Sequence, residues 1–316
     1  MGSAFLITTL DRPEELLRCV ATIMNQSILP EEIVVVDASK SSIEDRVREI
    51  VDPSQVELVY VLAPRGRTRQ LNLGIRESSR DPLFFVDDDA ELDPSFHAAM
   101  LEAFRWGGPS VGGVQAVMEN NNPRPLPERA AKAIFLLSRR TKDKPGRMLP
   151  SGYHTIPVKP SKPLQSEVIW LGATGYRRSV LEEFHFDESP DGPVRREDID
   201  FSYRVSRRYK LLITPEARFH HCKAPNARLG AREGRRSQLV NDYLVFRKNL
   251  PVAPLQNASF AWAMLGTLGL ELLKMALTGK SQPLMGTLDA VAKIARMERC
   301  RVLSRRQRRR DGYQSA

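Results

Sequence analysis

The chain has 316 residues, of which 41% are hydrophobic and 27% charged. This composition excludes wholesale disorder, and the length allows one large catalytic domain with an appendage or two modest domains. The formal net charge is +10, and much of the excess lies late in the chain. A basic tail attracts anions such as nucleic acid or anionic lipid, unless it is a solvated tail without a partner. Its arginines are Arg296, Arg299, Arg301, Arg305, Arg306, Arg308, Arg309 and Arg310.

The cysteines and the N-terminus indicate a reducing compartment. Cys19, Cys222 and Cys300 are odd in number and share no metal-ligand spacing, so we expect free thiols. The apolar segment 4–7 is too short for a secretion signal and is better interpreted as a buried strand. We therefore expect the protein in the cytoplasm, free or peripheral at the inner face of the cell membrane.

The first half alternates short apolar runs with helical patterns, which is typical of parallel α/β folds. Helices are expected from Pro13 and through Leu71 and Ile75. Continuous apolar strands imply a sheet that is covered on both faces. The expected strands are 4–8, 33–36, 56–61 and 83–86.

The second half is less regular. Residues 120–165 are rich in proline and predict a long functional or mobile loop. Order returns near 168–170. A helix is expected over 197–208, and strand-like segments are expected around 211–213 and 217–219.

The chain is helical from about Arg232 onward. Residues 258–277 are mostly apolar and approach the length of a membrane span, but Glu271 and Lys274 interrupt them. A second, amphipathic helix is expected over 284–297. The adjacent arginines favour peripheral contact of residues 258–316 with an anionic membrane. The alternative is a helical cap packed on the domain.

An acidic triplet, Asp87-Asp88-Asp89, directly follows the apolar strand 83–86. Ligands of open α/β sheets bind beyond the carboxyl ends of the strands. Clustered carboxylates repel one another, and a hard cation such as Mg²⁺ or Mn²⁺ offsets that cost while leaving positions for phosphate oxygens. The alternative is an exposed acidic turn.

Polar groups elsewhere could complete a nucleotide site. Asp37 ends another strand and could accept a hydrogen bond from a nucleobase or ribose. The segment Arg65 to Asn72 opens a helix with basic side chains and Gly66, a pattern that attracts pyrophosphate.

Three later features could serve the reaction. Asp198, near the start of a helix, could act as a general base toward an acceptor hydroxyl. His220 or His221 could complete the metal shell, and the order of the two remains open. Trp170 could stack on a sugar ring, or it could be a core residue on a strand.

From about residue 3 to residue 225 the ordered motifs resemble the family 2 glycosyltransferases, which have the GT-A fold. The matching segments are 8–13, 35–37, 66–75, 85–89 (like the family's DxD motif), 170–175, 197–204 (like its ED motif) and 215–221.

The resemblance implies roles for individual residues. Thr8, Asp11 and Asp37 would line the nucleoside pocket, and Arg69 would hold the base or pyrophosphate. The full set is Thr8, Asp11, Asp37, Gly66, Arg69, Asp87 and Asp88 for the nucleotide sugar; Asp87, Asp89 and His221 for the metal; Asp198 as base with Glu197 beside it; and Trp170, Gly172 and Thr174 for the acceptor.

The implied reaction is a single displacement with inversion, in which a sugar passes from a UDP- or dTDP-sugar to a hydroxyl of a glycan or lipid-linked acceptor in cell-surface polysaccharide synthesis. The implied layout is a GT-A catalytic domain over 1–228, with a nucleotide-sugar half (1–119) and an acceptor half (120–228), followed by a helical region over 229–316. A mostly parallel sheet flanked by helices is expected.

Three other functions were weighed. A nucleotidyltransferase would need a glycine-rich, lysine-bearing loop where residues 9–13 lie. A degenerate glycosyltransferase-like protein could bind sugars or act as a scaffold, but Asp87, Asp89 and Asp198 are retained. A nucleic-acid binder rests on charge alone, so nucleic acid is not an expected partner.

Overall fold

The computed structural model describes residues 2–121, 125–141, 145–157, 160–189, 195–222 and 229–314. Its centre is a nine-stranded sheet in the order β3-β2-β1-β4-β10-β6-β11-β5, with β9 paired to β11. The four strands expected in the first half form its parallel part. They are β1 (Ala4–Thr9), β2 (Glu32–Asp37), β3 (Glu57–Leu62) and β4 (Leu83–Asp87).

The rest of the sheet is mixed. β6 and β11 are parallel to each other, and β5, β9 and β10 run antiparallel to their neighbours. The two segments expected around 211–213 and 217–219 form one strand, whose register shifts between Thr214 and Arg218. The bounds are β5 (Ala90–Leu92), β6 (Val111–Met118), β9 (Leu164–Ser166), β10 (Ala173–Tyr176) and β11 (Lys210–His221).

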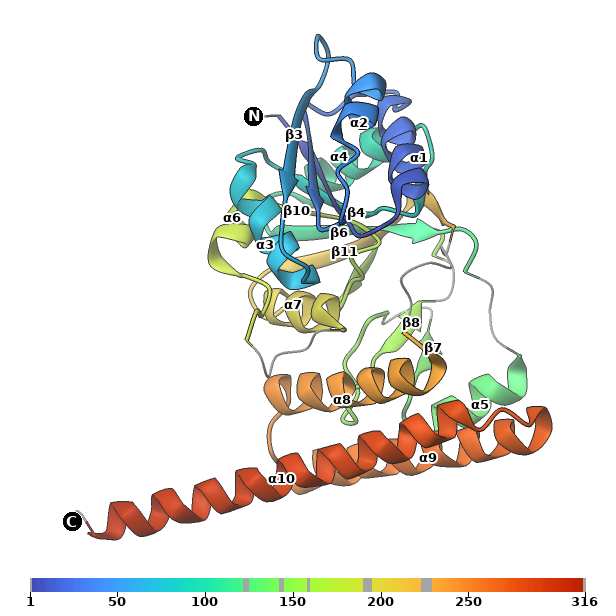
Figure 1. The fold of residues 1–316 in the computed structure, drawn as a ribbon, viewed down its shortest axis with the longest axis vertical. Helices are drawn as coiled ribbons and strands as arrows, with labels where there is room; N and C mark the ends of the chain where they lie inside the picture. Colours follow the sequence, from blue (N-terminus) through green and yellow to red (C-terminus); the bar gives the residue numbers. More distant parts are fainter. Residues whose placement is uncertain are drawn as a thin grey trace.

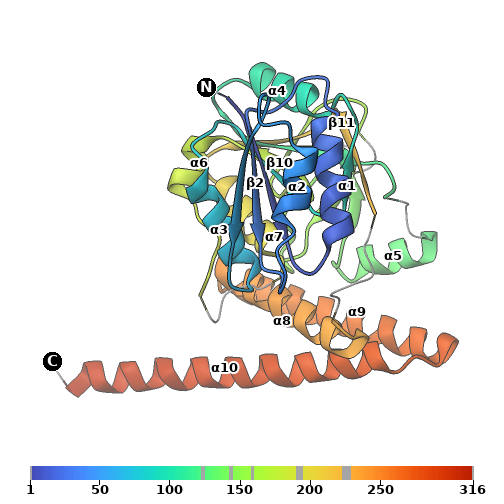
Figure 2. The same ribbon diagram turned by 45° about the horizontal axis from the view of Figure 1, so that its top comes forward.

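Helices cover both faces of the sheet, as the continuous apolar strands predict (Figure 2). Phe5 and Ile7 of β1 belong to the core under one set of helices, and Leu6 belongs to the core under the other. α3 approaches β1 closely because Gly74 has no side chain: a Cβ there would lie 2.1 Å from Cδ1 of Leu6. The first set is α1 (Pro13–Met24), α2 (Glu44–Ile50) and α4 (Phe96–Gly107), and the second is α3 (Arg67–Glu77), α6 (Arg178–Glu183) and α7 (Glu197–Val205).

The proline-rich segment is more regular than the sequence predicts. It contains α5 (Leu126–Ile134) and a pair of parallel three-residue strands, β7 (Arg139–Thr141) and β8 (Thr155–Pro157). The expectation of one long loop is therefore wrong for the described part. Proline is tolerated in the first turn of a helix, where Pro127 lies, and such short strands leave little periodic signal. Residues 122–124, 142–144 and 158–159 lie outside the described residues.

Three helices follow the sheet: α8 (Ala231–Asn249), α9 (Pro254–Thr278) and α10 (Gln282–Gln314). α8 lies between the sheet and the α9–α10 pair, and α10 extends beyond its neighbours toward the C-terminus (Figure 1). Leu239 and Val240 of α8 share a buried core with Ala290 of α10, and the rings of Phe246 and Phe260 stack with centroids 4.6 Å apart. The C-terminal helices are thus packed on the rest of the chain.

α9 is long and apolar enough to cross a membrane, although 28% of its most apolar window is buried. Its charged residue Glu271 faces inward, with its carboxylate 2.8 Å from the guanidinium of Arg235 in α8. Leu255, Leu265, Leu273 and Leu277 are exposed. The side chains of Arg305, Arg306, Arg308, Arg309 and Arg310 lie outside the described residues.

Candidate active site

Asp87, Asp89 and His221 form a group that could hold a metal ion. One ligand atom from each lies within 4.8 Å of the others. Nε2 of His221 lies 2.9 Å from Oδ1 of Asp89 and 3.9 Å from Oδ2 of Asp87. The antiparallel pairing of β11 with β5 places His221 opposite Ala90, directly after the acidic triplet. Two carboxylates and an imidazole are donors that Mn²⁺ accepts, so these residues fit such an ion.

His220 points to the other side of β11. Its Nε2 lies 3.0 Å from a carboxylate oxygen of Glu119, and the side chain is half exposed. Successive residues of a strand face opposite sides of the sheet, so only one of the two histidines can turn toward Asp89. Of the two orders that the sequence leaves open, the geometry favours His221.

Asp88 is anchored within the protein. Its carboxylate accepts hydrogen bonds from Oγ1 of Thr9 at 2.8 Å and from Arg12 at 2.9 Å. Burial raises the pKa of Asp88, and the charge of Arg12 opposes that rise. The same guanidinium lies 3.5 Å from Asp89, so it offsets part of the charge of the triplet. Sequence reasoning missed both Thr9 and Arg12.

Arg67, the first residue of α3, connects the triplet with the start of α7. Its guanidinium lies 2.7 Å from Oδ1 of Asp87 and 2.6 Å from Oε1 of Glu197. The charge of Asp87 raises the pKa of Arg67. The sequence drew attention to the basic start of this helix, but it assigned the contact to Arg69, whose side chain is exposed.

Asp198 belongs to the same site. Burial raises its pKa, the charges of Arg196 and Arg67 lower it, and the charge of Asp87 adds to the rise. The pKa of its neighbour Glu197 is also raised, chiefly by burial. The structure thus brings together the two carboxylates from the ED-like motif and the aspartates from the DxD-like motif, which come from distant parts of the sequence.

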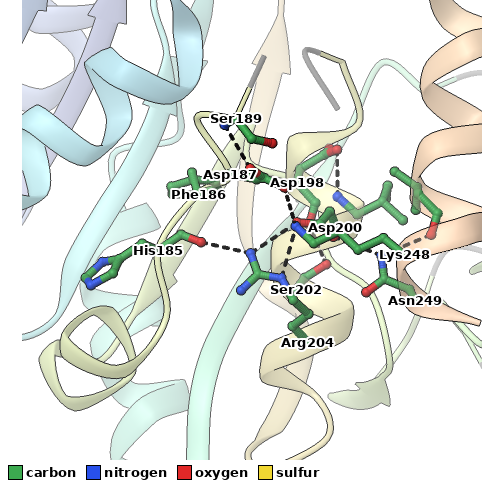
Figure 3. Close-up of polar contacts among 12 residues, drawn as sticks. His185, Phe186, Asp187, Ser189, Asp198, Asp200, Ser202, Arg204, Lys248 and Asn249 are labelled. Atoms are coloured by element: carbon green, nitrogen blue, oxygen red, sulfur yellow. Dashed lines mark hydrogen bonds and ion pairs between the residues drawn. The ribbon is translucent and has the colours of Figure 1, made fainter. Parts of the chain in front are cut away.

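A cluster of polar contacts fixes α7 against α8 (Figure 3). The buried carboxylate of Asp200 lies 2.9 Å from Nζ of Lys248, 2.9 Å from Nδ2 of Asn249 and 3.1 Å from the guanidinium of Arg204. The ammonium of Lys248 also lies 2.6 Å from Asp187. These contacts hold the helix that carries Glu197 and Asp198. Sequence reasoning missed them, because Lys248 and Asn249 lie about fifty residues further along the chain.

The backbone of Asp198 is held from within α7 and by the segment before β10. Oγ of Ser202 donates to the carbonyl oxygen of Asp198 at 2.6 Å and accepts from the amide of Ile169 at 3.1 Å (Figure 3). The position of Asp198 therefore depends on contacts on both sides of the helix.

A pocket of about 260 Å³ lies at the ends of β1 and β2. Asp11 and Asp37 line it, as expected, together with Thr9 and Lys40. The carboxylate of Asp37 accepts hydrogen bonds from the hydroxyl of Tyr60 at 2.6 Å and from the amide of Ser39 at 2.8 Å. The lining residues do not include three others expected for the nucleotide sugar, Thr8, Gly66 and Arg69.

The residues expected for the acceptor have different positions. Trp170 and Gly172 line a second pocket of about 130 Å³, and Trp170 lies outside the strands, so it is not a strand residue of the core. A Cβ at Gly172 would lie 3.3 Å from Oδ2 of Asp87, which shows how near this pocket is to the triplet. Thr174 is fully buried, and its hydroxyl donates to the carbonyl of Trp170.

The fold and the arrangement of carboxylates define a protein of the GT-A glycosyltransferase class. The chain belongs to glycosyl transferase family 2, whose family model matches residues 4–184, more than half of the chain. No curated protein matches it.

Solved structures share the fold at low sequence identity. The mannosyltransferase PcManGT from Pyrobaculum calidifontis, in complex with GDP-Man and Mn²⁺, has a TM-score of 0.57 and 15% identity, with 92% of this chain and 86% of that chain covered. TarS 1–349 from S. aureus has a TM-score of 0.53 and 13% identity, with 92% and 79% covered. The same protein in complex with UDP-GlcNAc has a TM-score of 0.51 and 13% identity, with 90% and 78% covered.

Proposed function

We propose that this family 2 glycosyltransferase is a metal-dependent, inverting enzyme that transfers a sugar from a UDP- or dTDP-sugar to a hydroxyl of a glycan or lipid-linked acceptor in cell-surface polysaccharide synthesis. The observation that carries the proposal is the junction at Arg67. This one guanidinium contacts Asp87 beside the candidate metal ligands and Glu197 beside the candidate base.

The donor would occupy the side of the site formed by β1, β2 and β4. Asp11 and Asp37 border the pocket in which a nucleoside would lie, and a carboxylate at Asp37 suits the ring N–H that uridine and thymidine share. Asp87, Asp89 and His221 would hold Mg²⁺ or Mn²⁺. When bound, the ion would supply Lewis-acid charge next to the diphosphate.

The protein side chains then have separate tasks. Asp198 would take the proton of the acceptor hydroxyl as that oxygen attacks the anomeric carbon. Glu197, paired with Arg67, would orient the acceptor, and Arg12 and Arg67 would offset the negative charge that leaves with the nucleoside diphosphate. A single displacement of this kind inverts the anomeric centre.

We further propose that the enzyme works in the cytoplasm, attached peripherally to the inner face of an anionic membrane through residues 258–316. The exposed apolar residues of α9, which include Leu265, Leu273 and Leu277, support this attachment. Arg296 and Arg299 of α10 add positive charge to the same region of the chain.

The proposed reaction can be tested with a panel of nucleotide sugars, in Mg²⁺ or Mn²⁺, scored for release of the nucleoside diphosphate. Release from a UDP- or dTDP-sugar that stops on addition of a chelator is the expected result. Release that is unaffected by chelator would refute the metal assignment, and preference for a purine nucleotide would refute the role given to Asp37.

A further inference from the structure

A third pocket, of about 310 Å³, lies where α5, α8 and α9 meet the strand β8. Four cationic side chains line it: Lys132, Arg196, Arg235 and Lys274. Among the described lining residues the only acid is Glu271, and it contacts two of these cations, at 2.8 Å and 3.6 Å. The lining is therefore rich in positive charge.

Several polar atoms of this pocket have no hydrogen-bond partner in the described part of the chain. They are Nε and one terminal nitrogen of Arg196, Nε of Arg235 and Nδ1 of His154, and all four are buried. The other terminal nitrogen of Arg196 is paired with Asp242 at 2.9 Å. A buried guanidinium N–H without an acceptor is costly, and an anion with several oxygen atoms satisfies such donors.

The pocket is connected with the candidate active site in two ways. Arg196 immediately precedes Glu197 and Asp198, and its charge is felt by the Asp198 carboxyl. The ring of His154 packs against Trp170, with centroids 5.7 Å apart, and Trp170 lines the pocket next to Asp87. A group bound here would therefore lie on the acceptor side of the site.

We propose that this pocket binds a phosphate or pyrophosphate group of the acceptor, with Arg196 and Arg235 as its hydrogen-bond donors. The inference rests on the proposed function, because it places an anionic group next to the hydroxyl that Asp198 would activate. Planar guanidinium groups recognise phosphate oxygens with two donors each. Lys132 and Lys274, from opposite walls of the pocket, add charge without a fixed direction.

Pyrophosphate is the probe for the test. Its binding to the full chain is measured by calorimetry at constant ionic strength, with chelator and without any nucleotide sugar. The pocket variant is Lys132→Gln with Lys274→Gln, and its matched control is Lys280→Gln with Lys293→Gln, two exposed lysines outside the pocket. Both variants change the net charge equally, and all four substitutions leave the buried arginines in place.

Wild type and control should bind pyrophosphate equally, and the pocket variant should bind about tenfold more weakly or worse. Absence of binding to wild type, or equal binding by the two variants, would overturn the proposal. The measurement needs no turnover. Pyrophosphate binding in a protein that never releases nucleoside diphosphate would therefore refute the proposed function and leave the anion site standing.

The source of the phosphate is decided with vesicles of phosphatidylglycerol, with phosphatidylcholine vesicles as reference. If the pocket variant floats less than the control and pyrophosphate displaces the wild-type protein, the bound group is a lipid headgroup. If flotation is the same for both and is unaffected by pyrophosphate, the phosphate belongs to a soluble acceptor.

Discussion

Nε of Arg67 lies 2.6 Å from a carboxylate oxygen of Glu197, so an arginine at the start of α3 meets the ED-like motif at the start of α7. The two residues are far apart in the sequence, and their contact joins the donor and acceptor sides of the candidate site. The first prediction concerns this pair.

Replacing Arg67 with Gln should lower kcat/KM about 100-fold, because it leaves Glu197 and Asp87 without their shared cation. Arg69→Gln, two residues later and exposed, is the comparison variant and should have a much smaller effect. Steady-state kinetics of both variants provide the measurement. A larger loss in Arg69→Gln would restore the role that the family resemblance implies for that residue.

The adjacent histidines provide a matched pair for the metal site. His221→Ala should raise the Mn²⁺ concentration needed for half-maximal activity about 10- to 100-fold, because it removes one of three ligand atoms that lie within 4.8 Å of one another. His220→Ala should leave that concentration unchanged, since this side chain faces Glu119. Metal titrations of activity distinguish the two. Equal effects would mean that β11 does not present one histidine to the site.

The pH dependence follows from the buried Asp198. Its pKa is raised above the ordinary value of 3.8, and the base must be ionised to act, so kcat/KM should fall as the pH drops through this raised pKa. The acid limb of the profile should therefore lie above about pH 4. Arg196 lowers the pKa of Asp198, so Arg196→Gln should move the limb to higher pH. A downward shift would contradict the account.

Stability should depend on Asp200. Its buried carboxylate accepts from Lys248, Asn249 and Arg204, and Asp200→Asn would leave two cations without a charged partner at that position. We expect the free energy of unfolding to fall by about 3 kcal/mol. The exposed pair partner Glu102, changed to Gln, serves as control and should have almost no effect. Urea denaturation of both variants is the measurement.

Membrane attachment can be tested without truncation, which would expose the face of α8 that packs on α10. Leu273→Gln with Leu277→Gln removes two exposed apolar side chains of α9 and should reduce flotation with anionic liposomes. Ile28→Gln, an exposed apolar residue between α1 and β2, is the control. Equal flotation of the two variants would remove the proposed attachment through α9.

The sequence predicted the parts of the site that follow strands. Asp37 and Asp87 were found because continuous apolar runs end at them, and the helix of Asp198 was found from its motif. Contacts between distant residues left no such signal. The ion pairs of Arg12 and Arg67 and the cluster around Asp200 depend on which helix packs on which strand, and no local pattern records that.

The same limit explains two errors of detail. Thr9 rather than Thr8 donates to Asp88, because the side chains of a strand alternate between faces and one residue decides which is which. The short strands β7 and β8 were missed, since three residues are too few to show alternation.

The most direct test of the central claim compares donor binding with turnover in Asp198→Asn. We predict that the variant binds the UDP- or dTDP-sugar in Mn²⁺ with a Kd close to that of wild type, while release of nucleoside diphosphate in the presence of acceptor falls at least about 100-fold. Turnover that equals that of wild type would contradict the assignment of Asp198 as the base and, with it, the proposed division of the site into a cation-binding and a proton-accepting half.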